Sequence, residues 1–156
     1  MIRGPVTGPQ YPLGPALDVL RRLWRLDHSL ARLSSRMEKS LGITAQQRLV
    51  LRCVGKFPGI TAGQLASVLH IDPGTMSSTL GRLERKKLLR RRYDPRDGRR
   101  VFLGLTPQGR ALDIPTTGTA ECAVEVLLGR TNAADLASFE AVLTALTELL
   151  DGQLIE

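Results

Sequence analysis

The chain has 156 residues and a hydrophobic fraction of 42%, which exclude a fibrous or disordered protein and suit one domain with a sizeable core. Its two cysteines, Cys53 and Cys122, are too few for a disulfide framework, and no apolar run approaches the roughly 18 residues of a membrane span. The N-terminal stretch lacks the apolar core of a signal peptide, so we expect a cytoplasmic protein, and the net charge of +7 favours an anionic partner, either nucleic acid or a membrane surface.

A first helix is expected at residues 15–41, because its apolar side chains recur in steps of three, four and seven along one helical face. Leu17 and Leu20 begin this face, and Gly42 ends the helix. Trp24 is interpreted as a core residue, with the lining of a ligand pocket as the alternative. The first dozen residues are rich in proline and glycine, so we expect irregular structure there.

Two further helices are predicted from their capping residues. Thr44 is a typical N-cap for a helix that the Pro-Gly pair at 58–59 ends. Thr61, with Gln64 three residues later, forms a capping box at the start of a short third helix. The apolar face expected for the second helix comprises Leu49, Val50, Cys53, Val54 and Phe57. Within it, we interpret the cysteine as a small buried hydrophobe rather than a redox sensor.

A fourth helix is predicted after Asp72, which is a good N-cap and is followed by Pro73 at the first helical position. Met76, Leu80 and Leu83 recur at i, i+4 and i+7, so this side of the helix should pack on the core. The opposite side presents small or hydroxyl-bearing residues and one arginine, namely Gly74, Thr75, Ser77, Ser78 and Arg82.

The stretch at 90–100, RRRYDPRDGRR, contains six arginines. Residues 82–100 together carry ten Lys or Arg against three acidic residues, so the local charge is ten minus three, or +7. Short strands at about 90–93 and 99–105 flank the turn residues DPRDG, which predicts a β-hairpin with arginines at its tip. A solvated charged loop is the simpler alternative for this stretch.

Thr106 and Pro107 start a fifth helix, which Pro115 and Gly118 should kink or break. A last helix, capped by Asn132, should run to about residue 150. Its apolar residues follow the a/d pattern of two heptads, which favours a partner helix over plain core packing. These residues are Leu136, Phe139, Leu143, Leu146 and Leu150.

Two short helices joined by a tight turn and followed by a hairpin predict a winged helix-turn-helix. We therefore expect one mainly α-helical domain with a small β-hairpin wing, in which the winged helix-turn-helix at 44–105 is flanked by dimerisation helices at 15–41 and 107–151. The exposed side of the fourth helix would enter the major groove of double-stranded DNA, and the wing would reach phosphates or the minor groove. The wing residues expected to contact or support DNA binding are Arg96, Asp97, Arg99 and Arg100, and the residues expected in the dimer interface are Leu17, Leu20, Leu136, Leu143, Leu146 and Leu150.

The motifs over about residues 41–110 resemble the MarR family of bacterial transcription regulators. The most specific part is a wing pattern of Asp, Gly and Arg, then a strand that ends in Leu-Thr, and a Gly three residues later. In this chain the pattern is made by Asp97, Gly98, Arg99, Leu105, Thr106 and Gly109. The resemblance implies a homodimeric repressor on a palindromic operator, with Arg99 in the minor groove and Asp97 as its supporting acid.

The resemblance also implies release from DNA by a small effector, such as an aromatic or phenolic compound, bound between the dimerisation helices and the winged region. The sequence identifies no residue of such a pocket. Two features depart from the family pattern. Lys87 stands where the family usually has a glycine, and the fifth helix, usually continuous, is interrupted by Pro115 and Gly118.

Three classes of function remain to be separated: a sequence-specific regulator, an architectural or protein-interaction module with the same fold, and an enzyme. No nucleophile–base pair, glycine-rich phosphate cradle or carboxylate pair supports an enzyme. His28 and His70 lack acidic neighbours at metal-ligand spacing, so we expect neither a metal nor a cofactor. A regulator prefers its operator to random DNA by roughly 10³ or more, and an architectural protein does not.

Overall fold

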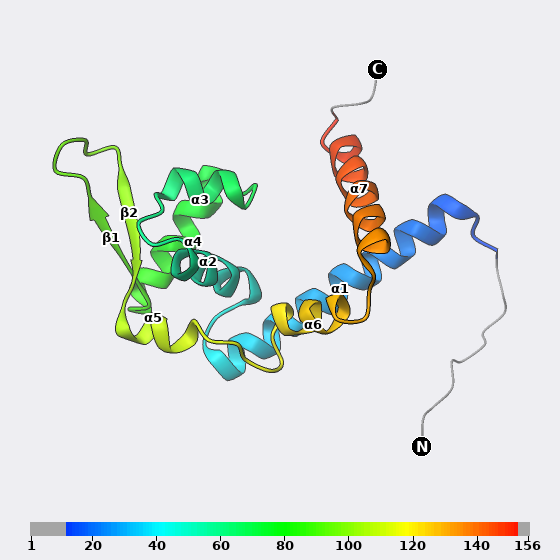
Figure 1. The fold of residues 1–156 in the computed structure, drawn as a ribbon, viewed down its shortest axis with the longest axis horizontal. Helices are drawn as coiled ribbons and strands as arrows, with labels where there is room; N and C mark the ends of the chain where they lie inside the picture. Colours follow the sequence, from blue (N-terminus) through cyan, green and yellow to red (C-terminus); the bar gives the residue numbers. More distant parts are fainter. Residues whose placement is uncertain (1–11, 153–156) are drawn as a thin grey trace.

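The structure is a computed structural model and describes residues 12–152 (Figure 1). The Pro- and Gly-rich stretch at 1–11, where irregular structure is expected, lies outside the described residues. Within them, the elements in chain order are α1 (Pro15–Leu41), α2 (Ala45–Lys56), α3 (Ala62–Val68), α4 (Pro73–Arg85), β1 (Leu89–Tyr93), β2 (Val101–Leu105), α5 (Pro107–Leu112), α6 (Ala120–Leu128) and α7 (Ala133–Leu150). None of the helices between residues 12 and 152 has the length and apolar character needed to span a bilayer. The fold is thus mainly helical with one β-hairpin, as predicted.

The helices divide into a compact lobe and an extended part. Figure 1 shows α2, α3, α4, α5 and the hairpin packed together, while α1 leads away from them with α6 alongside and α7 projecting. The hydrophobic core lies in the lobe, where all the clustered buried residues fall between Ile43 and Leu105. In contrast, α6 and α7 bury no residue, and α1 buries only Met37. We call α2 to α5 with the hairpin the winged lobe, and α1, α6 and α7 the outer helices.

The predicted helix starts are confirmed by side-chain caps. The Thr44 hydroxyl accepts a hydrogen bond from the Gln47 N–H, and the Gln47 side chain accepts one from the Thr44 N–H. Thr61 and Gln64 form the same reciprocal box at α3. Each box pairs backbone groups that a helix N-terminus otherwise leaves free, which explains why these short helices begin where they do.

The wing is a two-stranded antiparallel hairpin in which Leu89 pairs with Leu105 and Tyr93 with Val101. The second strand starts at residue 101, two residues later than predicted, because the Arg100 N–H closes the turn by donating to the Asp97 carbonyl. The Leu103 N–H donates to the Ile60 carbonyl, so the segment before α3 lies along the free edge of β2. This contact fixes the wing to the helix-turn-helix.

The predicted interruption of the fifth helix is confirmed. The chain leaves helical geometry after Leu112 and re-enters it at Ala120, with Pro115 and Gly118 in between. Gly118 has a φ of 76°, which favours glycine over other residues. The family's single long helix is therefore two helices, α5 and α6, separated by residues 113–119.

Three apolar residues are placed differently from the sequence-based expectation. Trp24 is 68% exposed rather than part of a core, and Leu49 and Phe57 are 50% and 44% exposed rather than buried on α2. Cys53 is half-buried against the core, in agreement with its interpretation as a small hydrophobe. Trp24 lies in the first half of α1, which extends beyond the winged lobe (Figure 1), and no element among the described residues covers it.

Lys87, which stands where the family usually has a glycine, adopts the left-handed backbone conformation. A residue other than glycine lowers the stability of the fold at such a position. The φ of Lys87 is 57°, and the residue follows α4 in a Schellman turn where the Leu88 N–H donates to the Leu83 carbonyl and the Lys87 N–H to the Glu84 carbonyl. A side chain in this region is strained by roughly 1 kcal/mol, and glycine is not. His70, with a φ of 49°, occupies the same position after α3.

Lys87→Gly is therefore expected to raise the free energy of unfolding by about 0.5–1 kcal/mol, because relief of the strain exceeds the added entropy of the unfolded chain. Urea denaturation at neutral pH measures this change. As a control, Lys39→Gly in the last turn of α1 should lower stability by up to about 1 kcal/mol, since that lysine has helical geometry. A loss of stability in Lys87→Gly would contradict the strain assigned to this position.

Candidate nucleic-acid interface

The α4 helix is held with one side on the core and the other in solvent. Met76, Leu80 and Leu83 are buried, as their spacing predicts. The Asp72 carboxylate accepts a hydrogen bond from the Thr75 N–H at 2.9 Å, so this residue is the N-cap, and Pro73 takes the first helical position. The turn at 69–72 between α3 and α4 completes a helix-turn-helix.

The solvent side of α4 carries all the residues of this helix that the sequence assigns to DNA recognition. The residues are exposed in the structure: Gly74, Thr75, Ser77, Ser78 and Arg82. Small side chains at the start of a helix allow its backbone N–H groups to approach a phosphate, and hydroxyls can reach phosphates or base edges. Their contact with DNA remains a prediction, whereas their common exposure on one side of one helix is observed.

The wing tip presents its arginines to solvent and is shaped by two aspartates. The Asp97 carboxylate accepts a hydrogen bond from the Arg99 N–H at 3.0 Å, and Asp94 accepts one from the Arg96 N–H at 2.9 Å. As the supporting acid, Asp97 thus acts on the backbone of Arg99 and not on an arginine side chain. The arginine side chains Arg96, Arg99 and Arg100 are exposed, with the last of these lying over the Phe102 ring.

The turn does not require a glycine at position 98, although Gly98 belongs to the wing motif. Its φ lies outside the left-handed region, and an added Cβ would meet open space. The tip is held by the hydrogen bonds of Asp94 and Asp97 instead. Gly109, the last residue of the motif, does need to be glycine, because an added Cβ would lie 1.9 Å from the Leu88 carbonyl oxygen.

Arg91 supports the position of the wing in a way that sequence reasoning missed. It lies on β1, and its guanidinium donates to the Ser77 carbonyl at 3.1 Å and lies 3.0 Å from the Glu84 carboxylate, in an ion pair whose angle is too poor for a hydrogen bond. The wing is thus bound directly to α4. The sequence carries no signal for this role, because nothing in the local pattern distinguishes Arg91 from the other five arginines of the run.

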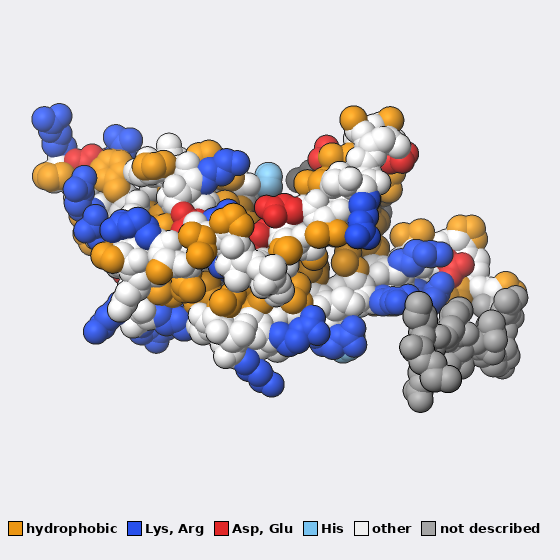
Figure 2. All heavy atoms as spheres, turned by 60° about the horizontal axis from the view of Figure 1, so that its bottom comes forward, with side chains coloured by type: hydrophobic (Ala, Val, Ile, Leu, Met, Phe, Trp, Pro, Cys, Tyr) orange, Lys and Arg blue, Asp and Glu red, His pale blue; other side chains and the backbone are white. Residues whose placement is uncertain are grey.

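Basic side chains dominate the end of the molecule that carries the wing. Figure 2 shows Lys and Arg gathered over that end, with few acidic side chains among them on this face. The ten basic residues at 82–100 come from the end of α4, the turn after it, β1 and the loop of the hairpin. Such a surface attracts the phosphate backbone of a nucleic acid.

The pKa of Asp72 is lowered, first by its side-chain hydrogen bond with Thr75 and second by further backbone hydrogen bonds. A carboxyl with a depressed pKa in the folded state contributes stability above its unfolded pKa and loses it as the pH falls through the folded value. Asp72→Asn keeps an equally good N-cap that does not titrate. The wild type should therefore lose stability relative to Asp72→Asn below about pH 4. Thermal unfolding of both proteins from pH 7 to pH 3 measures this, and parallel curves would contradict it.

The residues assigned to a dimer interface lie on the outer helices. Leu17, Leu143 and Leu150 are exposed, and Leu20, Leu136 and Leu146 are half-buried. None of these side chains is fully covered by the described residues. Their role in an interface remains a prediction.

A helix-turn-helix with an arginine-bearing hairpin fixed beside its second helix defines a winged-helix protein of the DNA-binding type. Comparison with known proteins gives the family. The MarR family model matches residues 41–100. The transcriptional regulator HosA of Escherichia coli O157:H7 is 31% identical over 91 residues, which are 58% of this chain and 67% of that protein. The chain belongs to the MarR family of transcription regulators.

The match to HosA of Escherichia coli O111:H- spans 65% of that protein at 32% identity, so it covers just under two thirds of this relative's length. Among solved structures, the MepR–DNA complex of S. aureus has a TM-score of 0.69 and 27% identity, covering 83% of this chain and 96% of MepR. BpsR of Bordetella bronchiseptica, whose DNA binding is regulated by 6-hydroxynicotinic acid, has a TM-score of 0.64 and 26% identity, with coverage of 83% and 98%. The likeness thus extends through the outer helices.

Proposed function

We propose that this protein is a homodimeric, sequence-specific DNA-binding repressor that acts on a palindromic operator and is released by a small effector. The observation that carries the proposal is the joint exposure of a polar recognition face on α4 and an arginine wing on the same lobe. An α-helix fits the major groove, and a hairpin beside it can reach the neighbouring minor groove. Repression follows if the operator overlaps a promoter, because the bound dimer excludes polymerase.

The proposed dimer rests on the outer helices. Within the described residues, α6 and α7 bury no side chain, although Val126, Leu127, Phe139 and Val142 are large and apolar. A folded protein rarely leaves so much contiguous apolar surface in water. A second copy of the chain is the simplest cover, because a two-fold interface places the same helices against each other and two recognition helices on a palindrome.

The proposed effector site lies near the start of α4. A hollow of about 690 Å³ is bounded by α3, α4 and Asp151 at the end of α7. Its walls include Ile71, Met76 and Leu80, and His70 offers a polar group at its edge. Such a site suits a small aromatic or phenolic compound, a class to which the 6-hydroxynicotinic acid that regulates BpsR belongs. An effector there would act through unequal affinity for DNA-competent and incompetent arrangements.

The decisive experiment measures binding to the DNA that flanks the protein's own gene, against random duplex of equal length. We expect at least about a thousandfold preference at physiological salt. Addition of small aromatic acids, tested one at a time, should lower the affinity for the specific duplex. Transcription from a promoter carrying that duplex should fall when the protein is added and recover with an active effector.

An architectural or protein-interaction module is the alternative function for the same fold. It predicts similar affinity for both duplexes, or none for either, with no effect of aromatic acids. Equal binding to the two duplexes at several salt concentrations would overturn the proposed regulator and favour this alternative.

A further inference from the structure

The break between α5 and α6 lies against one face of α2. Arg48, Arg52 and Gly55 occupy this face, since they recur at i, i+4 and i+7. Among the described residues, Arg48 is the one charged side chain that is fully buried, with 1% of it exposed. An unpaired buried charge is costly, so a guanidinium in this position needs partners.

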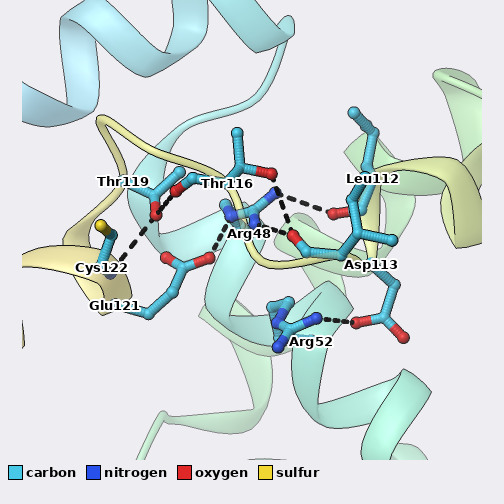
Figure 3. Close-up of polar contacts among 9 residues, drawn as sticks. Arg48, Arg52, Leu112, Asp113, Thr116, Thr119, Glu121 and Cys122 are labelled. Carbon is cyan, nitrogen blue, oxygen red and sulfur yellow. Dashed lines mark hydrogen bonds and ion pairs between the residues drawn. The ribbon is translucent and has the colours of Figure 1, made fainter. Parts of the chain in front are cut away.

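All three nitrogens of the Arg48 guanidinium donate hydrogen bonds to residues at the break (Figure 3). One terminal nitrogen donates to the Leu112 carbonyl at 2.8 Å and the other to the Ile114 carbonyl at 2.7 Å, while Nε donates to the Glu121 carboxylate. Leu112 ends α5, and Glu121 lies in the first turn of α6. A single guanidinium therefore joins the two sides of the interruption to α2.

Two neighbours on the same face reinforce this contact. Arg52 donates to the Asp113 carboxylate at 2.9 Å. Gly55 gives that carboxylate room, because an added Cβ would lie 1.9 Å from an Asp113 oxygen. The face of α2 is thus shaped to the irregular segment at 113–119 over two helical turns, and not through one side chain alone.

The helix break explains why an arginine is needed. In a continuous helix the Leu112 and Ile114 carbonyls would accept from N–H groups four residues later, but the chain is not helical there. The planar guanidinium carries five donors in a fixed fork and donates to both carbonyls, and the Ile114 carbonyl also accepts from the Thr116 hydroxyl. The Glu121 carboxylate also benefits from its place near the N-terminus of α6. Lysine, with a single nitrogen, cannot reach all three acceptors together.

Both covalent connections between the winged lobe and the outer helices are non-helical. One passes through Gly42, which has a φ of 74°, and the other through residues 113–119. At Gly42 the carbonyl accepts a hydrogen bond from the exposed Lys86 side chain. At the second connection the cross-link is the buried Arg48. The angle between the lobe and the outer helices therefore depends on side-chain contacts and not on a continuous helix.

We propose that Arg48 is a positioning residue for DNA binding, which fixes the winged lobe relative to the helices that hold the second protomer. This inference rests on the proposed dimer. Two recognition helices must lie about 34–36 Å apart to reach successive half-sites. If the connection at 113–119 is flexible, the distance between the two recognition helices varies. Binding of the second half-site then contributes less to the affinity for the whole operator. Loss of this cross-link does not change how each winged lobe binds a single half-site.

The test compares two duplexes, both derived from sequences that the wild type selects from a random pool: one with two half-sites and one with a single half-site. Arg48→Met keeps the length of the apolar stem and removes the guanidinium. We expect it to lower the affinity for the two-half-site duplex at least about tenfold and that for the single half-site less than about threefold. Arg48→Lys should lie in between. Arg130→Met, an exposed arginine between α6 and α7, is the control and should bind as the wild type does.

Equal losses on both duplexes, or no loss on either, overturn the proposal. A wild type that does not prefer two half-sites to one contradicts the proposed function itself, before any variant is compared. If Arg48→Met fails to fold, Glu121→Gln decides, because Glu121 is partly exposed and glutamine keeps an oxygen that can accept from Arg48. It should lose about threefold on the two-half-site duplex alone, with faster amide exchange confined to 113–119. A uniform loss, or unchanged binding and exchange, overturns the proposal.

Discussion

Arg99→Ala is expected to weaken binding to operator DNA at least about 30-fold while the fold and the oligomeric state stay intact. The Arg99 side chain is exposed, and the turn is held by the Arg99 backbone N–H, which alanine keeps. A contact to a base edge is worth about 1–3 kcal/mol, and the proposed dimer loses two such contacts together. Affinity measured on operator and random duplex, with circular dichroism and sedimentation for fold and assembly, checks this result.

The salt dependence of Arg99→Ala distinguishes two kinds of contact. If the arginine binds a phosphate, the slope of log affinity against log salt should shrink by roughly 0.9 per contact, or about 1.8 for a dimer. If it reads the minor groove, the slope should change less and the loss should be larger on operator than on random DNA. An Arg99→Ala protein that binds operator with wild-type affinity would falsify the wing assignment and leave a solvated loop.

The structure decides which arginines can serve as controls. Arg91 lies in the wing on β1 and Arg110 follows it on α5. Arg91 bonds to the Ser77 carbonyl and Arg110 to the Leu105 carbonyl, so alanine at either site disturbs the lobe. Arg130 is exposed and lies between α6 and α7, away from the hairpin. Arg130→Ala removes the same charge and should leave operator affinity within about twofold of the wild type.

Leu143→Glu is expected to convert the proposed dimer into monomers or aggregates and to abolish operator binding. Leu143 is 43% exposed in one chain and occupies the middle of the a/d seam on α7. Glutamate there places a charge in the proposed interface, and two-fold symmetry places it twice. At about 2 kcal/mol per copy, the dimer dissociation constant should rise roughly a thousandfold. Analytical ultracentrifugation across micromolar concentrations measures the change.

Ala141→Glu is the matched control for this prediction, since it introduces the same side chain on the same helix. Ala141 is exposed and lies at the f position, opposite the seam. It should leave both assembly and DNA binding unchanged. If the wild type sediments as a monomer at micromolar concentration, or if Leu143→Glu remains dimeric, the proposed interface is wrong.

Much of the fold can be predicted from short stretches of sequence. Thr44, Thr61 and Asp72 predicted helix starts that the structure confirms, because a cap acts on a backbone N–H only three residues away. The side of α4 that faces the core followed from the spacing of Met76 and Leu80. Local rules of this kind need no knowledge of the rest of the chain, and they sufficed for the helix-turn-helix and its wing.

Contacts between distant segments required the tertiary structure. Arg48 and its partners are separated by 64 to 73 residues, and no local pattern marks it as different from an exposed arginine on a helix. Trp24 fits a helical core face by spacing, yet it is exposed because none of the described residues packs over it. Spacing determines which residues share a face, whereas the path of the whole chain determines what that face meets. The sequence alone therefore determined the elements and which side of α4 is exposed and polar, and the tertiary structure decided how the winged lobe is held to the outer helices.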